Sequence, residues 1–147
     1  MFRRLLDLEF CKRHRDYAPL FLRLLIGAFI IHGVQDNILN AEQMTEFEKF
    51  LMARGVPAAA IAAPLSVYAQ FICGVSILLG AWIRLTSVVF IINFVCAIVI
   101  AHLGQSFHSM FPALMIIAAG LFFLFNGAGR LSIDSLLEQR GMVKAGH

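Results

Sequence analysis

Long apolar stretches separated by short polar segments dominate the pattern of this chain. Four of them come close to or reach the length of about 20 residues that a helix needs to cross about 30 Å of hydrocarbon. They cover residues 19–39, 61–82, 85–103 and 110–126. Arg23 is the one arginine or lysine well inside a stretch. The pattern predicts an all-α membrane protein built as a bundle of four transmembrane helices.

Two further segments have the periodicity of helices that lie along a membrane surface. Ahead of the first stretch, apolar residues recur at helical spacing among Lys and Arg residues, as in an interfacial amphipathic helix; they are Phe2, Leu5, Leu6 and Phe10. In the first loop, a short interfacial helix is expected from Thr45 to the break at Gly55 and Pro57. We therefore expect a basic amphipathic segment at 1–18, a membrane domain at 19–137 and a polar tail at 138–147.

Composition narrows the class of protein further. Of the 147 residues, 60% are hydrophobic and 14% are charged, which is too little charge for the surface of a soluble domain of this size. The three cysteines, Cys11, Cys73 and Cys96, are too scattered for a disulfide framework or a zinc site. The lipid bilayer is thus the first expected partner of the chain.

The basic residues predict the orientation of the helices. Nine lysines and arginines lie in the segments that share a face with both termini, whereas the other face carries only Lys49 and Arg54. Because basic segments stay on the cytoplasmic side, we expect a multi-pass protein of the cell inner membrane with both termini in the cytoplasm. Basic residues directly before an apolar stretch also favour contact with anionic lipid over nucleic acid, and we expect no nucleic-acid partner.

Polar residues at the predicted outer ends of the helices form the first candidate site. They are His32, Asp36, His102 and His108, with Gln70 deeper in the second stretch. Imidazole and carboxylate groups can hold a divalent metal, two histidines can hold a haem, and a neutral histidine can bind a quinone carbonyl. The spacing matches no established metal motif, so no metal is assigned. Ordinary interfacial hydrogen bonding is the simpler interpretation.

The second stretch also carries a stripe of small and polar residues at four-residue spacing: Ala62, Ser66, Gln70 and Gly74. Small residues allow two membrane helices to approach closely, and polar ones can hydrogen-bond across the contact. We therefore expect this stripe to face another helix, with Asn93 as the partner of Gln70.

At the opposite ends of the helices the sequence predicts a structural cluster of Arg23, Arg84, Arg130 and Asp134. An arginine inside a membrane span needs a partner or must reach the interface. Asp134 follows the fourth stretch on the same side, and we expect it to neutralise Arg23.

With these positions in hand, the chain resembles the DoxX family of small four-helix membrane proteins. The landmarks of the first half are Arg23, Gly27, Phe29, His32-Gly33, Gly55-Val56-Pro57, Gly74, Leu79-Gly80 and Arg84. Those of the second half are Gly127-Ala128-Gly129-Arg130-Leu131-Ser132-Ile133-Asp134. Two positions depart from the family pattern. Gln70 stands where relatives often have an acidic residue, and Asp36 follows His32-Gly33 where they often have a lysine.

The resemblance implies a function in membrane redox biochemistry, because some DoxX-like proteins are similar to a membrane subunit of a thiosulfate-oxidising, quinone-reducing enzyme. The first hypothesis is thus a membrane subunit of a quinone-linked oxidoreductase or respiratory complex, with quinone as the cofactor. The second is a non-catalytic anchor or assembly subunit of a larger membrane complex, which suits the lack of a self-sufficient catalytic motif. A small transporter is a third reading. Other membrane subunits or a second copy of the chain are the expected protein partners.

Overall fold

The computed structural model describes residues 9–102 and 104–141, without the side chain of His102. Helices and the turns between them make up this part of the chain. In chain order the helices are α2 (Glu9–Arg13), the 3-10 turn η1 (Arg15–Tyr17), α3 (Ala18–Leu39), α4 (Ala41–Ala53), α5 (Ala59–Leu79), α6 (Ile83–Ala97), the π-helical turn η2 (Ile98–His102), α7 (Phe107–Asn126) and α8 (Ile133–Gln139).

Four of these helical segments are long and apolar enough to cross a membrane. The spans are Arg15–Leu39, Ala59–Leu79, Ile83–Ala101 and Phe107–Asn126. Their bounds lie within a few residues of those predicted from the apolar stretches. The predicted four-helix membrane bundle is therefore confirmed.

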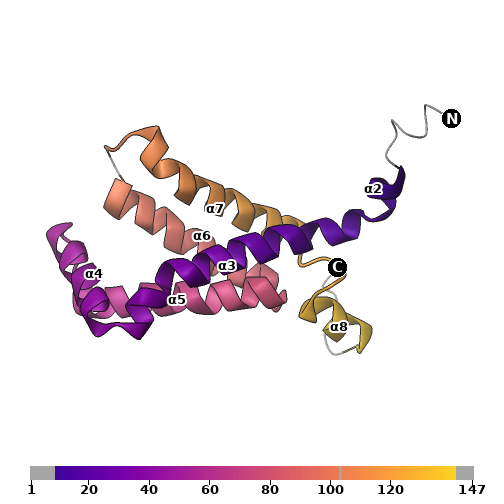
Figure 1. The fold of residues 1–147 in the computed structure, drawn as a ribbon, viewed down its shortest axis with the longest axis horizontal. Helices are drawn as coiled ribbons and strands as arrows, with labels where there is room; N and C mark the ends of the chain where they lie inside the picture. Colours follow the sequence, from indigo (N-terminus) through magenta and orange to yellow (C-terminus); the bar gives the residue numbers. More distant parts are fainter. Residues whose placement is uncertain (1–8, 103, 142–147) are drawn as a thin grey trace.

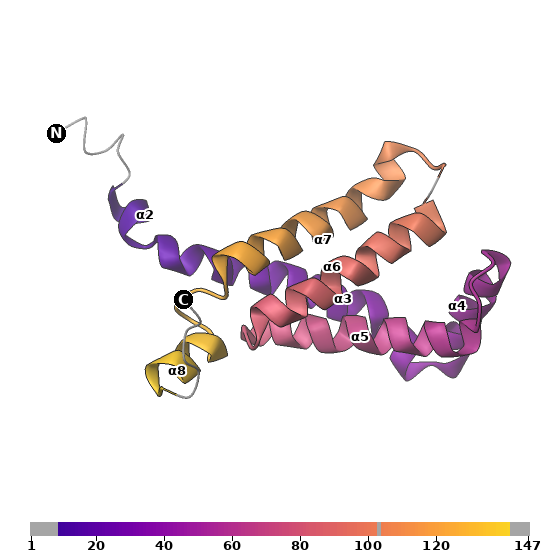
Figure 2. The ribbon, with the colours of Figure 1, turned by 180° about the vertical axis from the view of Figure 1, so that it is seen from behind.

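The long helices associate as two close pairs, α3 with α5 and α6 with α7. The α7–α8 loop and α8 lie at one end of the bundle, on the side of α2, and α4 lies across the other end (Figure 1). The same arrangement is seen from behind in Figure 2. The two pairs meet near the α8 end and diverge toward the α4 end. An apolar core links all four helices through residues such as Ile30, Ile77, Phe90 and Phe123.

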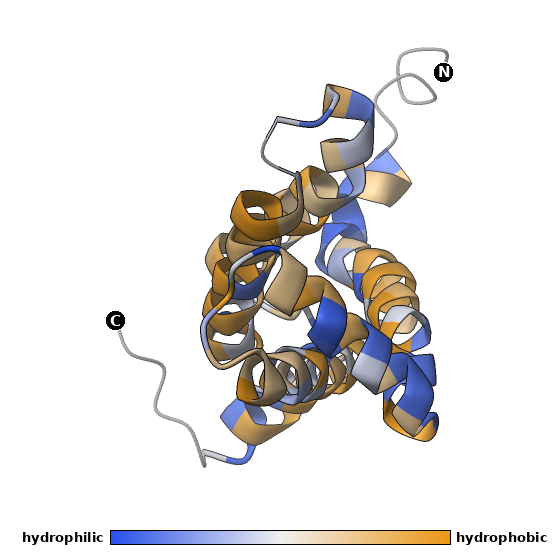
Figure 3. Ribbon diagram, turned by 90° about the vertical axis from the view of Figure 1, so that its left-hand side faces the viewer, coloured by the Kyte–Doolittle hydropathy of each residue, from blue (hydrophilic) through white to orange (hydrophobic). Residues whose placement is uncertain are grey.

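The outer surface of the bundle suits a lipid environment. Viewed from the α4 end, the long helices are mostly hydrophobic, and hydrophilic residues gather on α4 and at the helix ends (Figure 3). Phe21, Leu25 and Phe125 are among many large apolar side chains that are exposed. Burying this surface in hydrocarbon removes it from water, which is the main driving force for insertion.

Two glycines allow α3 and α5 to pack closely. A Cβ atom at Gly27 would lie 2.9 Å from the carbonyl oxygen of Gly74, and one at Gly74 would lie 3.0 Å from the Cγ1 of Ile31. Such contact between backbones is typical of membrane helix pairs with small residues at the crossing. Gly74 of the predicted stripe thus faces another helix.

The surface helix of the first loop is present as α4 and starts earlier than predicted. The side chain of Asn40 accepts a hydrogen bond from the backbone N–H of Glu42 at 2.9 Å, and this cap begins the helix at Ala41 rather than at Thr45. The buried face of α4 packs on the start of α5, where Leu51 lies beside Ala59 and Ala63. The N-terminal amphipathic pattern falls mostly on residues 1–8, outside the described part of the chain.

Candidate functional site

Arg23 is a buried charged side chain in the second turn of α3. Only 1% of its surface is exposed. Its guanidinium donates hydrogen bonds to two backbone carbonyls of the α7–α8 loop, from Nη1 to Ala128 at 3.1 Å and from Nη2 to Leu131 at 2.5 Å. Removing a cation from water is costly unless oxygen acceptors replace the water. The loop supplies these acceptors, and it is thereby tied to the first membrane helix.

The α7–α8 loop is shaped to reach Arg23. Gly129 has a φ of +79°, a left-handed conformation that favours glycine, and a Cβ there would lie 2.8 Å from the carbonyl oxygen of Asp16. The Ser132 hydroxyl donates to the carbonyl of Gly129 at 2.6 Å and accepts from the N–H of Ser135 at 3.1 Å, which caps α8. The loop therefore has a defined conformation between α7 and α8.

Asp134 joins this loop to the turn between α5 and α6. Its two carboxylate oxygens accept from the backbone N–H groups of Trp82 at 2.6 Å and Ile83 at 2.9 Å. Its own N–H donates to the carbonyl of Gly80 at 3.0 Å. Because Ile83 starts α6, a carboxylate here also complements the positive end of that helix.

Gly80 completes the arrangement by letting the turn pass beside Arg23. Its φ is +67°, and a Cβ atom there would lie 1.9 Å from Nη1 of Arg23 and 2.6 Å from the Cβ of Ser132. The start of α3, the α5–α6 turn and the α7–α8 loop therefore meet at one point. We call this set the Arg23 cluster; it comprises Arg23, Gly80, Ala128, Leu131, Ser132 and Asp134.

The predicted pairing of Arg23 with Asp134 takes a different form in the structure. The two side chains make no direct ion pair; Arg23 binds carbonyls and Asp134 binds N–H groups of the neighbouring turn. Arg23 holds the α7–α8 loop, and Asp134, just after that loop, holds the α5–α6 turn and the start of α6; the Asp134 charge acts on Arg23 through space rather than by direct contact. The Nε atom of Arg23 is buried with no hydrogen-bond partner among the described residues.

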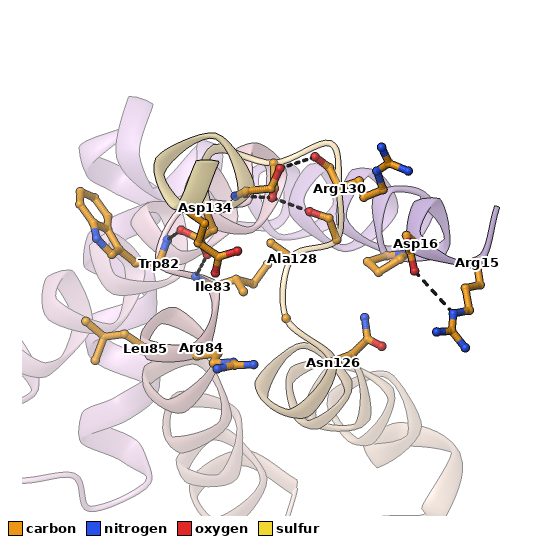
Figure 4. Close-up of a pocket in the computed structure, with 16 residues that line it drawn as sticks. Arg15, Asp16, Trp82, Ile83, Arg84, Leu85, Asn126, Ala128, Arg130 and Asp134 are labelled. Atoms are coloured by element: carbon orange, nitrogen blue, oxygen red, sulfur yellow. Dashed lines mark hydrogen bonds and ion pairs between the residues drawn. The ribbon is translucent and has the colours of Figure 1, made fainter. Parts of the chain in front are cut away.

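A cavity of about 900 Å³ with several charged side chains in its lining lies beside the Arg23 cluster, between the starts of α3 and α6 and the end of α7 (Figure 4). Arg84, Arg130 and Asp134 of the predicted cluster line it, together with Arg15, Asp16 and Asn126. Arg84 projects from α6 toward the end of α7, where Asn126 is located. Sequence reasoning missed Asn126 because a lone asparagine at a helix end ordinarily indicates only a cap.

Arg130 holds its position through backbone and ring contacts. Its N–H donates to the carbonyl of Asp16 at 3.2 Å. Its guanidinium carbon lies 5.9 Å from the ring centre of Tyr17, within the range of a cation–π contact. Arg84 and Arg130 have no acidic partner in the part of the chain that the structure describes.

The predicted outer site is not gathered in one described cavity. His32 and Asp36 are exposed on α3, and His32 shares a 2.8 Å hydrogen bond with Gln35. His108 is exposed near the start of α7, and His102 ends η2 with its side chain outside the described part. Within the described residues, no group of three or more His, Cys, Asp or Glu could hold a metal. A shared outer pocket stays a prediction.

Gln70 belongs to a small polar cluster between α5 and α6. The Ser66 hydroxyl accepts from Nε2 of Gln70 at 3.2 Å and from Nδ2 of Asn93 at 3.1 Å. The predicted Gln70–Asn93 contact thus runs through Ser66. Oδ1 of Asn93 is buried without a described partner. This arrangement joins two helices within the apolar interior, as interhelical hydrogen bonds commonly do.

Comparisons with known proteins are consistent with this fold. A model of the DoxX family matches residues 18–103. An uncharacterized membrane protein of Mycobacterium tuberculosis is 31% identical over 146 residues, and the match covers 86% of each chain. No solved structure gives a significant match. The family match includes Arg23 and Gly80 and ends before the loop that binds Arg23.

Proposed function

This chain belongs to the DoxX family, and from that premise we propose that it is a non-catalytic membrane subunit that anchors and stabilises a larger redox complex at the inner membrane. The redox setting rests on the family resemblance. The anchoring role rests on how the chain uses Arg23, its one buried charge among the described residues. Both Nη atoms of that arginine bind the backbone of the α7–α8 loop, so they are not free to bind a substrate.

The consequence of this arrangement is a fixed polar segment outside the membrane spans. Asp134 at the start of α8 is held by the α5–α6 turn, while Glu138 and Arg140 at its far end are exposed. Leu131 and Leu136 are also exposed, although they lie beyond the last span. A rigid segment with mixed charged and apolar side chains is suited to bind a partner chain, because little conformational entropy is lost on association.

We propose that this segment faces the cytoplasm, because the described helices and turns at this end carry most of the basic residues. α2, the start of α6 and the loop to α8 contribute Arg13, Arg84 and Arg130, whereas the α4 end carries Lys49 and Arg54. A partner bound at α8 would then be a cytoplasmic or cytoplasm-facing protein.

The proposal is tested by native mass spectrometry after gentle detergent extraction from the native membrane. The wild-type chain is expected to retain a defined partner chain in fixed stoichiometry. Arg23→Gln should lose this partner while the chain still inserts. Arg54→Gln, a change at the α4 end, serves as the control and should retain it. Retention of the partner by Arg23→Gln, or quinone reduction from thiosulfate by the purified chain alone, would contradict the proposal.

A quinone-linked role is the second candidate, and the cavity beside the Arg23 cluster favours it. Arg84 and Asn126 lie at the ends of membrane spans, where a quinone headgroup would reach hydrogen-bond donors without leaving the bilayer. Copurified quinone that disappears in Asn126→Ala would support this role.

A further inference from the structure

The cavity beside the Arg23 cluster lies next to a shallow, open apolar groove on the exposed side of α7. The groove is lined by Ala118, Leu121, Phe122 and Phe125, and it meets the cavity at Asn126, which lines both. Asn126 is the last residue of the fourth span. The cavity and the apolar groove thus border each other at this residue, at the end of a membrane span.

The cavity holds more free cationic than free anionic groups. Arg84 and Arg130 have no acidic partner among the described residues. Among the acids of the lining, Asp134 uses both oxygens on backbone N–H groups, and Asp16 lies 3.6 Å from Arg15. Glu138, exposed on α8, is the remaining carboxylate.

We propose that this cavity and groove bind an anionic phospholipid, with its phosphate at Arg84, which projects toward Asn126, and one acyl chain along α7. The guanidinium fork matches the geometry of phosphate oxygens and binds them with two parallel hydrogen bonds. Asn126 stands where headgroup and chain join and can donate to a glycerol or ester oxygen. Basic pockets between membrane helices are suited to anionic headgroups. The inference does not depend on the function proposed above.

Charge separates this ligand from the alternatives. A quinone headgroup is neutral and would leave the Arg84 guanidinium without a counter-charge. Free phosphate would bind the Arg84 guanidinium and leave the groove on α7 unused. An anionic lipid occupies both parts of the site.

The test measures the thermal unfolding midpoint in nanodiscs of phosphatidylcholine with and without phosphatidylglycerol. Saturating a site by ligand raises the midpoint by an amount that grows with ligand excess. We expect a rise of about 5 °C for the wild-type chain. Arg84→Gln should abolish the rise. Arg140→Gln, an exposed arginine of the same end that does not line the cavity, should retain it.

Two further measurements separate the possible sources of the anion. Ala118→Phe fills the groove without touching the arginines and should reduce the rise if an acyl chain lies there. Inorganic phosphate added to phosphatidylcholine nanodiscs should have little effect. An equal rise with inorganic phosphate, an equal rise in Arg84→Gln, or an Arg84-dependent rise with ubiquinone in place of phosphatidylglycerol would each overturn the assignment. Arg84 has no described hydrogen bond or ion pair, and Arg84→Lys provides a second variant that keeps the charge and loses the fork.

Discussion

At the scale of single residues, Arg23 has the strongest effect on this structure. Its position inside an apolar stretch predicts that it needs a partner, and this much could be concluded from the sequence. The identity of the partner could not, because the acceptors are backbone carbonyls of Ala128 and Leu131. Backbone groups leave no mark on the residue pattern. Their direction depends on the left-handed conformation of loop glycines such as Gly129, which only the folded loop defines.

Gly80 provides a test of this contact. Gly80→Ala should destabilise the fold by about 3 kcal/mol or more, because the added Cβ displaces a buried arginine from its acceptors. Gly55→Ala is the matched control. Gly55 also has a left-handed φ, of +75°, but nothing lies within 4 Å of its Cβ position, so only the cost of about 1–2 kcal/mol for that conformation applies. Unfolding in mixed micelles measures the stability of both variants. Equal losses of unfolding free energy would show that Gly80 is not constrained by Arg23.

A double-mutant cycle tests whether Arg23 and Asp134 act on one scaffold. Arg23→Gln and Asp134→Asn should each lower the free energy of unfolding, by about 3 kcal/mol and about 1–3 kcal/mol respectively. The double variant should lose less than the sum, since Arg23 holds the loop that leads to Asp134 and the two charges interact through space. Strictly additive losses would mean that the two anchors are independent.

At the scale of helices, the apolar stretches predicted where the spans lie, but not which side of each helix faces the lipid. Length and hydropathy decide whether a helix crosses the bilayer, so the four spans followed from the sequence. The lipid-facing sides of the helices could not be predicted from the sequence, because apolar residues occupy both sides of every helix. Phe90 is fully buried and Phe125 is 79% exposed, although both are phenylalanines in apolar spans. The π-helical turn at Ile98–His102 also had no signal in the residue pattern.

The α3–α5 crossing gives a prediction at this scale. Gly27→Ala should cost stability, since its Cβ would lie 2.9 Å from a backbone oxygen that cannot easily move. Gly33→Ala, on the same helix, is the control. No atom lies within 4 Å of its Cβ position, and alanine there should be neutral or stabilising by up to about 1 kcal/mol. Thermal unfolding in detergent compares the two, and a neutral Gly27→Ala would show that the helices do not depend on this close contact.

At the scale of the whole molecule, charge placement gives an orientation that the fold can accommodate. Both described ends of the chain lie on the side of the Arg23 cluster, and α4 with its acidic residues lies on the other. The sequence could place Arg23, Arg84, Arg130 and Asp134 at the same end of the bundle. It could not show which of them line the cavity and which binds the loop. The predicted outer site was inferred from helix heights alone. Height does not fix the direction in which a side chain points, and His32 and Asp36 are exposed.

Cysteine labelling in intact cells tests the orientation. In a chain whose native cysteines are replaced, a membrane-impermeant maleimide should label a cysteine substituted for Glu46 on α4. It should miss one substituted for Glu138 on α8 until the membrane is permeabilised. Both positions are exposed, so access to the side chain itself does not differ. The reverse labelling pattern would place the Arg23 cluster on the outer side.

The central claim is that Arg23 fixes the α7–α8 loop and α8 to the membrane helices. Hydrogen exchange of Arg23→Gln in nanodiscs tests it most directly, because exchange reports the local opening of each segment. The account predicts that amides of residues 127–139 exchange at least about tenfold faster than in the wild type, while those of α5 keep their rates. Unchanged exchange at 127–139, or an equal rise throughout the bundle, would contradict it.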